Sequence, residues 1–277
     1  MRYESTTYEV RGAGGWITLN RPDKKNAVDL TVIDEVGHAL ISAASNPNVR
    51  AVVITGAGTA FCSGADLTSV SEAVSDDGSG DRDSILHFLK RFEELLRTIR
   101  TLPKPVIAAI NGVTCAGGIE TIACCDLNIA VESATFSDAH ARWGFMPGLG
   151  GGRELARAVG TFKAKEMMFT ADNYSATQMA AAGLVNHVVS DGQLVNFVDG
   201  VVSKLALRSP RGLARMKQMI NDGMDMPWDV AARYEMLCLE AQLHSRDFVE
   251  GLAAFQEHRQ PAFPRMRHPG MVRARED

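Results

Sequence analysis

The sequence predicts an α/β domain followed by an all-helical segment. Short apolar runs that read as strands alternate with helical stretches as far as about residue 190, which is typical of an α/β core. Beyond that point, four successive stretches show apolar residues at helical spacing. With 45% hydrophobic and 22% charged residues, the composition is that of an ordinary globular protein. We therefore expect a core over residues 1–190 and a helical segment over residues 191–277.

The first hundred residues alternate between the two periodicities. The expected elements are, in order, the strands Tyr8–Val10 and Gly15–Asn20, the helix Leu30–Ala44, the strand Ala51–Thr55 and the helix Ile85–Ile99. Gly12 and Gly14 mark the turn of the first hairpin. The stretch Ser71–Ser84 is polar and rich in Gly, Ser and Asp, so it reads as a surface loop.

The densest alternation lies between residues 104 and 131. It comprises the strand Val106–Ile110, a turn at Asn111-Gly112, the helix Ile119–Cys124 and the strand Leu127–Val131. The later helices are expected over Gln193–Leu207, Gly212–Asp222, Trp228–Leu243 and Phe248–Glu257.

Charge and apolar runs exclude several classes of function. A net charge of -4 disfavours a nucleic-acid-binding protein, which needs a basic surface. The longest apolar run, Val106–Ile110, is too short to cross a membrane. Met1–Val10 lacks the apolar core of a signal peptide, so a cytoplasmic location is expected.

The five cysteines favour neither a disulfide framework nor a metal site. They form no C-x-x-C pair and no Cys/His cluster with zinc-ligand spacing, so no metal is expected. We expect all five to be buried, inert thiols in a reducing compartment.

A pair of glycines at a predicted helix start, Gly117-Gly118, carries a specific physical meaning. Such a pair leaves backbone N–H groups unpaired at the positive end of the helix dipole, where they can stabilise an oxygen that gains negative charge. Glu120 falls in the same first turn. Glycines are also common in ordinary loops, and a Glu is favourable in any first helical turn, so this segment alone leaves both interpretations open.

Other motifs are incomplete. Gly56-Ala57-Gly58 follows a strand, but Phe61 takes the place of the third glycine of a dinucleotide-binding turn. No G-x-S-x-G elbow occurs, and Gly112 lies one position too early to make a nucleophile elbow around Cys115. A packed Cys115 is therefore favoured over a thiol nucleophile.

Several blocks, in order along nearly the whole chain, resemble the crotonase superfamily of enoyl-CoA hydratases and isomerases. They are Asn20–Ala27 (NRPDKKNA), Gly56–Leu67 (GAGTAFCSGADL), Ile110–Asp126 (INGVTCAGGIETIACCD), Gly148–Gly160, Ala181–Val185 and Glu250–Phe263.

The resemblance implies a crotonase-like spiral of ββα units whose helical C-terminal segment packs homotrimers, often paired as hexamers. It implies an acyl-CoA substrate and no cofactor, because coenzyme A is part of the substrate. The expected reaction is that of an enoyl-CoA hydratase, a lyase of the fatty-acid β-oxidation type that adds water across the α,β double bond. The alternatives are isomerisation, decarboxylation or thioester hydrolysis on an acyl-CoA, or non-catalytic acyl-CoA binding.

Positions matched to the family motifs supply the expected site. The N–H groups of Ala65 and Gly117 would form an oxyanion hole for the thioester carbonyl. The expected substrate-binding residues are Lys24 (or Lys25) at a phosphate, and Ser63, Ala65, Asp66, Leu67 and Gly117 along the adenine, pantetheine and thioester path. Phe263 and Arg265 would reach a coenzyme A site or pack the terminus.

Two further positions concern the chemistry itself. Glu120 matches one of the two carboxylates with which the family's hydratases hold and activate water. The second falls on His140, where this chain departs from the family pattern. Neutral imidazole can bind the same water or shuttle a proton, or the residue can be part of the pocket wall. Asp138 would compensate for the lost carboxylate or orient the His; on a strand the two would face the same side.

Overall fold

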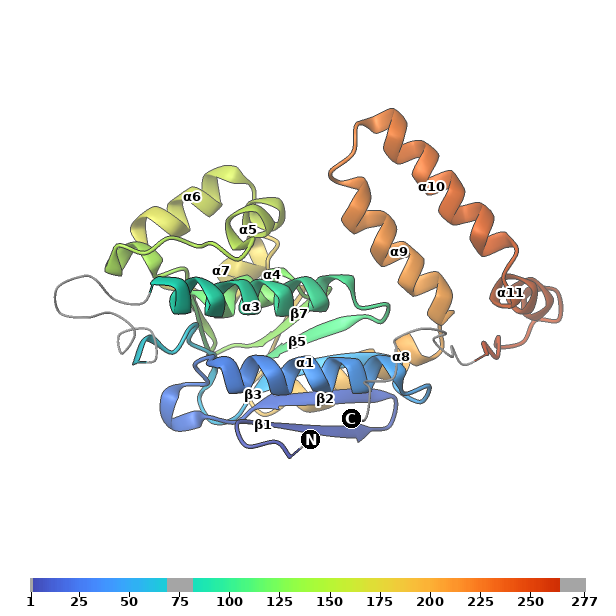
Figure 1. Ribbon diagram of the computed structural model, residues 1–277. Coiled ribbons are helices and arrows are strands. Elements are labelled where there is room, and N and C mark those ends of the chain that lie inside the picture. Colours follow the sequence, from blue (N-terminus) through green and yellow to red (C-terminus); the bar gives the residue numbers. More distant parts are fainter. Residues whose placement is uncertain (1, 69–81, 265–277) are drawn as a thin grey trace.

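The computed structural model describes residues 2–68 and 82–264, and the described residues contain two β-sheets (Figure 1). The six-stranded sheet has the order β1-β2-β3-β5-β7-β10, and the four-stranded sheet has the order β4-β6-β8-β9. The strands are β1 (Thr6–Arg11), β2 (Gly14–Leu19), β3 (Ala51–Gly56), β4 (Ala60–Cys62), β5 (Val106–Ile110), β6 (Val113–Cys115), β7 (Leu127–Val131), β8 (Thr135–Ser137), β9 (Tyr174–Ser175) and β10 (His187–Val189).

Helices separate most of these strands. They are η1 (Pro22–Lys24), α1 (Leu30–Ser45), α3 (Arg82–Thr101), α4 (Gly117–Ala123), η2 (His140–Trp143), α5 (Gly151–Val159), α6 (Thr161–Thr170), α7 (Ala176–Ala181), α8 (Leu194–Ala206), α9 (Pro210–Gly223), α10 (Trp228–Leu243) and α11 (Arg246–Gln256). The predicted α/β core with helices after it is thus confirmed.

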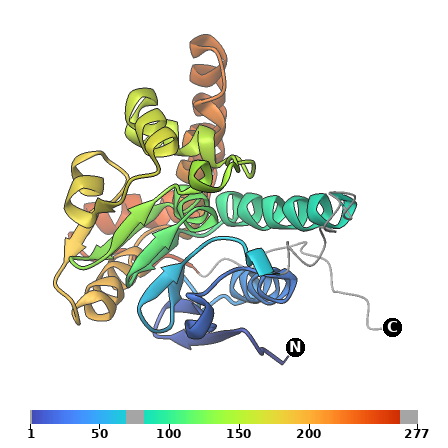
Figure 2. The same ribbon diagram turned by 90° about the vertical axis from the view of Figure 1, so that its left-hand side faces the viewer.

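The six-stranded sheet forms the centre of the molecule. β1 and β2 make the expected antiparallel hairpin, and β2, β3, β5, β7 and β10 pair in parallel. Parallel strands covered on both faces are apolar along their whole length, as β5 is here. Figure 2 shows the strands between α8 on one side and α1 with α3 on the other. The six-stranded sheet is therefore packed on both faces.

The helices after residue 190 divide into two groups. Although the sequence places residues 191–277 in a separate segment, α8 packs on β3, β5 and β7 and contributes Leu194, Val198 and Val202 to the core. The helices that leave the core begin with α9, and α9, α10 and α11 project to one side (Figure 1). Lys217 of α9 anchors them, with its Nζ 2.7 Å from an Asp126 carboxylate oxygen.

Element bounds agree closely with the expected ones where periodicity is strong. β5, β7 and α10 have the predicted bounds. The helix predicted from Ile85 already begins at Arg82, so the end of the expected loop Ser71–Ser84 is helical. The rest of that loop, residues 71–81, lies outside the described residues.

The expectation for the cysteines is partly wrong. All five are free thiols, but only Cys62 and Cys124 are buried, while Cys115, Cys125 and Cys238 are half-buried. Burial raises the pKa of both Cys62 and Cys124 to about 12, so these two thiols are inert.

Of the helices within the described ranges, none has the length and apolar character that a membrane span requires.

Candidate active site

The predicted site residues follow three neighbouring strands of the four-stranded sheet. Ala65 comes shortly after β4, Gly117 and Glu120 after β6, and His140 after β8. β4 pairs in parallel with β6, and β6 with β8. Because the carboxyl ends of parallel strands meet at the same edge of a sheet, the three segments converge there.

Two backbone segments approach each other closely at this edge. A Cβ atom built on Gly64 would lie 3.0 Å from the Gly117 nitrogen, and one built on Gly117 would lie 3.3 Å from the Gly64 Cα. Within residues 2–68 and 82–264, neither the Ala65 nor the Gly117 N–H donates a hydrogen bond to the protein. The two amides thus lie on adjacent segments and are available to a ligand.

The turn into α4 fixes the direction of the Gly117 amide. Ala116, the residue before α4, has φ 47° and ψ −115°, a conformation that a non-glycine residue adopts only at a cost of about 1–3 kcal/mol. The Phe92 ring of α3 lies so close that a Cβ on Gly117 would meet it at 2.9 Å. Strain at Ala116 and the absence of a side chain at Gly117 are both expected where a backbone N–H, rather than a side chain, has to contact a ligand.

Glu120 lies on the first turn of α4 with its carboxylate buried. Its Oε1 accepts a hydrogen bond from the Leu149 N–H at 3.0 Å, just before α5 begins. Burial is the largest influence and raises the pKa of Glu120, although the Leu149 N–H, His140 and the Gly151 N–H each lower it. A raised pKa makes a carboxylate a stronger base, which suits it to take up a proton.

His140 and Asp138 are not on a strand, so that expectation is wrong. β8 ends at Ser137, Ala139 is left-handed with φ 57°, and His140 begins the 3-10 turn η2. The tight turn nevertheless brings the two side chains together, with His140 Nδ1 2.9 Å from Asp138 Oδ1. The other ring nitrogen, Nε2, lies 3.9 Å from Glu120 Oε2.

An ion cluster joins the segment that contains Arg21 and Lys24 to Asp66, the residue after Ala65. Asp66 accepts hydrogen bonds from Arg21 Nη2 at 2.9 Å and from Lys24 Nζ at 3.0 Å. Although burial raises the pKa of Asp66, the hydrogen bonds from Lys24 and Arg21 outweigh it and lower that pKa to about 2. Asp66 is therefore ionised. Its ion pair with Lys24 holds the half-exposed Lys24 side chain beside residues 65 and 66.

The remaining predicted residues are placed as follows. Ser63 is half-buried, with its hydroxyl 3.3 Å from the Lys24 carbonyl, and Leu67 is exposed. Phe263 follows α11, with its ring near Gly251 of that helix and outside the sheet core, and Arg265 is outside the described residues. The sequence did not indicate Gly64, Leu149 or Gly151 as site residues, because each contacts a segment that is distant in the sequence. For Leu149 and Gly151, the Gly-rich stretch after Pro147 was a signal that could have indicated them.

A cavity of about 490 Å³ lies elsewhere and is not part of this site. Its walls include Trp16 within β2, Asn111 after β5 and Asp191 after β10, and none of the predicted catalytic residues. We locate the site by the convergence of free amides and buried ionisable groups, since these supply chemistry and an open hollow does not.

The space beside Glu120 gives a direct test of its position. A Cβ on Gly151 would lie 2.1 Å from Glu120 Cγ, whereas one on the adjacent Gly152 would meet nothing closer than 3.5 Å. Gly151→Ala is therefore expected to displace the carboxylate and to lower kcat on an enoyl-CoA about 100-fold or more. Gly152→Ala should leave kcat within about twofold, and equal rates for the two variants would contradict this placement.

Comparisons with known proteins bear on the family and the fold. The family model for enoyl-CoA hydratase/isomerase matches residues 12–266. The chain is 32% identical to the short-chain-enoyl-CoA hydratase of Clostridium acetobutylicum over 94% of this chain and 97% of that protein, and 30% identical to the crotonyl-CoA hydratase of Syntrophomonas wolfei over 95% and 99%. A crystal structure of an enoyl-CoA hydratase from Bacillus anthracis superposes with a TM-score of 0.88 at 30% identity, over 94% of this chain and 99% of that one. The fold expected from the resemblance is thereby confirmed.

Proposed function

The chain belongs to the enoyl-CoA hydratase/isomerase family, and from this premise we propose that it is an enoyl-CoA hydratase of the fatty-acid β-oxidation type. It adds water across the α,β double bond of an acyl-CoA thioester. One observation carries the proposal: a buried carboxylate with a raised pKa, Glu120, lies on the helix that begins with the free Gly117 amide. The proposed base and one of the two oxyanion donors thus belong to the same helical turn.

The amides of Ala65 and Gly117 would receive the thioester oxygen. When water attacks the β-carbon, electrons move to that oxygen and an enolate forms. Pre-aligned N–H donors stabilise such an oxygen without any rearrangement, and losing one donor typically costs about 3–4 kcal/mol. The close approach of Gly64 and Gly117 supports this role because it places the two free amides on neighbouring segments.

Glu120 and His140 would hold the reacting water between them. The 3.9 Å gap between Glu120 Oε2 and His140 Nε2 is too long for a direct hydrogen bond, but one water can lie within hydrogen-bond distance of both atoms. When ionised, Glu120 can only accept hydrogen bonds, so it is the group that takes the proton of this water.

The coenzyme A part of the substrate would lie along residues 63–67. Backbone atoms of Ser63, Ala65 and Leu67 would contact the adenine and pantetheine. The ammonium of Lys24 would bind a phosphate. Asp66 keeps that ammonium in place through its 3.0 Å contact. The reaction needs no cofactor, since coenzyme A arrives as part of the substrate.

The test is turnover of crotonyl-CoA. Loss of the absorbance of the conjugated thioester, with formation of a 3-hydroxyacyl-CoA, is the expected result. Release of free coenzyme A, a shifted double bond or loss of carbon dioxide would instead identify a hydrolase, an isomerase or a decarboxylase. Binding of coenzyme A thioesters without turnover of any enoyl chain would favour a carrier.

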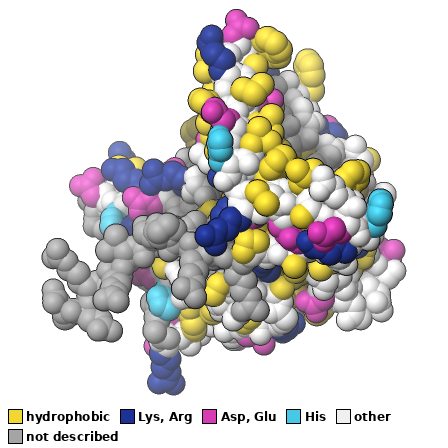
Figure 3. All heavy atoms as spheres, turned by 90° about the vertical axis from the view of Figure 1, so that its right-hand side faces the viewer, with side chains coloured by type: hydrophobic (Ala, Val, Ile, Leu, Met, Phe, Trp, Pro, Cys, Tyr) yellow, Lys and Arg dark blue, Asp and Glu magenta, His cyan; other side chains and the backbone are white. Residues whose placement is uncertain are grey.

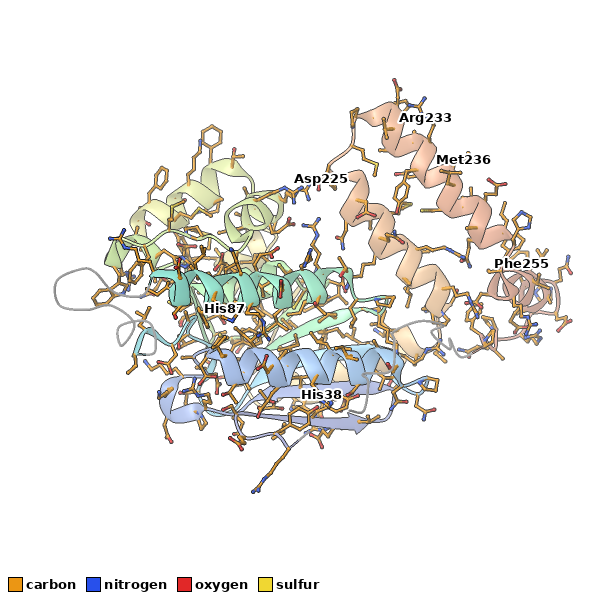
Figure 4. All side chains as sticks on the ribbon, viewed as in Figure 1. His38, His87, Asp225, Arg233, Met236 and Phe255 are labelled. Carbon is orange, nitrogen blue, oxygen red and sulfur yellow. The ribbon has the colours of Figure 1, made fainter. Side chains whose placement is uncertain are left out.

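We also propose that residues 191–277 serve in homotrimers, or hexamers built from two trimers. Figure 3 shows hydrophobic side chains gathered along the projecting helices. Met236 of α10 and Phe255 of α11 are 63% and 78% exposed and stand on helices away from the sheets (Figure 4). Apolar surface of this extent marks an interface.

The chain would work in the reducing cytoplasm, where its free thiols remain reduced.

Light scattering after size exclusion checks the assembly. The wild type is expected at three or six times the chain mass. Met236→Glu places a charge in the buried interface and is expected to release smaller species, because an unpaired buried charge is costly. Ile41→Glu, at an exposed apolar residue of α1, is the matched control and should not change the mass. A monomeric wild type would rule the assembly out.

A further inference from the structure

Asp138 is a buried carboxylate with a single side-chain partner in the described ranges. It is 1% exposed, and its Oδ1 lies 2.9 Å from His140 Nδ1. Within residues 2–68 and 82–264, no backbone N–H and no Lys or Arg bonds this carboxylate. Burying a charge is costly unless a partner compensates it, so the His140 ring is the group that this buried Asp serves.

The backbone is bent so that the pair can form. Residues two apart on a strand point to the same face, but Ala139 adopts φ 57° and ψ −10°, and the His140 N–H donates to the Asp138 carbonyl at 2.8 Å. This tight turn folds the ring back onto the carboxylate. The ring nitrogen Nδ1 is thus engaged by Asp138, and the other, Nε2, lies 3.9 Å from Glu120 Oε2. A strained residue at this point has no evident use except to set that orientation.

We propose that Asp138 is a positioning residue, which holds His140 through Nδ1 so that Nε2–H donates a proton to the α-carbon of the substrate. The inference rests on the proposed hydratase function and deepens it by giving His140 and Glu120 separate tasks. An imidazolium bonded to a carboxylate is electrically neutral and carries one transferable proton. The Asp138–His140 pair thus stands where the family pattern has a carboxylate residue, and it can supply the proton that a protonated carboxyl group would supply.

The proton and electron balance closes without another reactant. The water oxygen bonds to the β-carbon, its proton passes to Glu120, and the electrons of the double bond move through the α-carbon to the thioester oxygen. The enolate electrons then form a C–H bond with the proton from His140 Nε2. Transfer of the proton from Glu120 to His140, across the 3.9 Å gap by way of a water, restores both groups.

The electrostatic surroundings agree with this assignment. Burial lowers the pKa of His140, but the hydrogen bond with Asp138 and the charges of Asp138 and Glu120 outweigh burial and raise it. Within the described ranges, other ionisable groups near the pair include Arg142 on the same turn and Cys115 of β6. The pKa of Cys115 responds to the charges of Arg142, Asp138 and Lys25. Activity should therefore be lost at low pH as Glu120 takes up a proton, and at high pH as His140 loses one.

The pH dependence of kcat/KM for crotonyl-CoA tests the proposal in Asp138→Asn, His140→Gln and the double variant. Asp138→Asn is expected to move the alkaline limb to lower pH by about one unit or more and to lower kcat about 10-fold or more, with little change in KM. Added to His140→Gln, it should change kcat by less than about twofold, because a positioning residue acts only through its partner.

An independent readout is the ¹⁵N NMR titration of the His140 ring, assigned by comparison with His140→Gln. In the wild type, Nδ1 should carry a proton and the ring should titrate above pH 6.5; in Asp138→Asn the midpoint should fall. An unchanged midpoint, or an equal loss of kcat with and without His140, would overturn the proposal. If crotonyl-CoA is not hydrated at all, the proposed function fails, and the titration still decides whether Asp138 controls the ring.

Discussion

Glu120→Gln is expected to abolish most hydration of crotonyl-CoA, with kcat falling by about 10²–10⁴ and KM changing little. General-base assistance is worth about that factor, and the amide of Gln cannot take the proton of water. The amide oxygen can still accept the Leu149 N–H that Glu120 Oε1 accepts at 3.0 Å, so the substitution preserves the local hydrogen bond. Initial rates over a range of substrate concentrations separate the two constants.

Stability distinguishes a catalytic Glu120 from a structural one. Burial raises the pKa of Glu120, so the folded state binds this proton more tightly than the unfolded state, and the free energy of unfolding falls as pH rises between the two values. Above the folded-state pKa, the ionised carboxylate is therefore a net cost that Gln removes. The variant is expected to melt at or above the wild-type temperature while losing activity. Unchanged kcat would remove Glu120 from the reaction, and a large loss of stability would make its role structural.

Much of the fold is readable from periodicity because long elements repeat their pattern several times. The apolar run of β5 and the helical spacing of α10 are long enough to fix both ends. β4, β6 and β8 have three residues each, which is too few to show a period of two. The sheet that brings the site together was thus the part that the sequence pattern could not reveal.

The site was predicted by position and not by geometry. The glycine pair at 117 and 118 carries a local signal, because the chemistry needs backbone amides there. By contrast, the contact of Gly151 with Glu120 spans 31 positions, and no local pattern indicates which of several glycines must lack a side chain. The left-handed conformation of Ala139 could not be predicted either, since alanine rarely adopts it and nothing in the neighbouring sequence requires it.

Gly64→Ala is expected to lower kcat about 10²–10³-fold by blocking the Gly117 amide. The new Cβ would lie 3.0 Å from the Gly117 nitrogen and 3.0 Å from the Ala116 Cβ, in the space where the thioester oxygen would be held. Loss of one oxyanion donor has that magnitude because the donor acts mainly on the charged intermediate. Gly64 also has φ +96°, so alanine there adds a strain of about 1–3 kcal/mol and should lower the melting temperature.

A matched control separates the blocked amide from the backbone strain. Gly192 has φ +84°, and a Cβ built on it meets nothing within 4 Å. Gly192→Ala should therefore lose similar stability while keeping kcat within about twofold. If both alanine variants lost stability alike and both kept full turnover, the proposed role of the Gly117 amide as an oxyanion donor would be contradicted, because the added methyl group would lie 3.0 Å from that nitrogen.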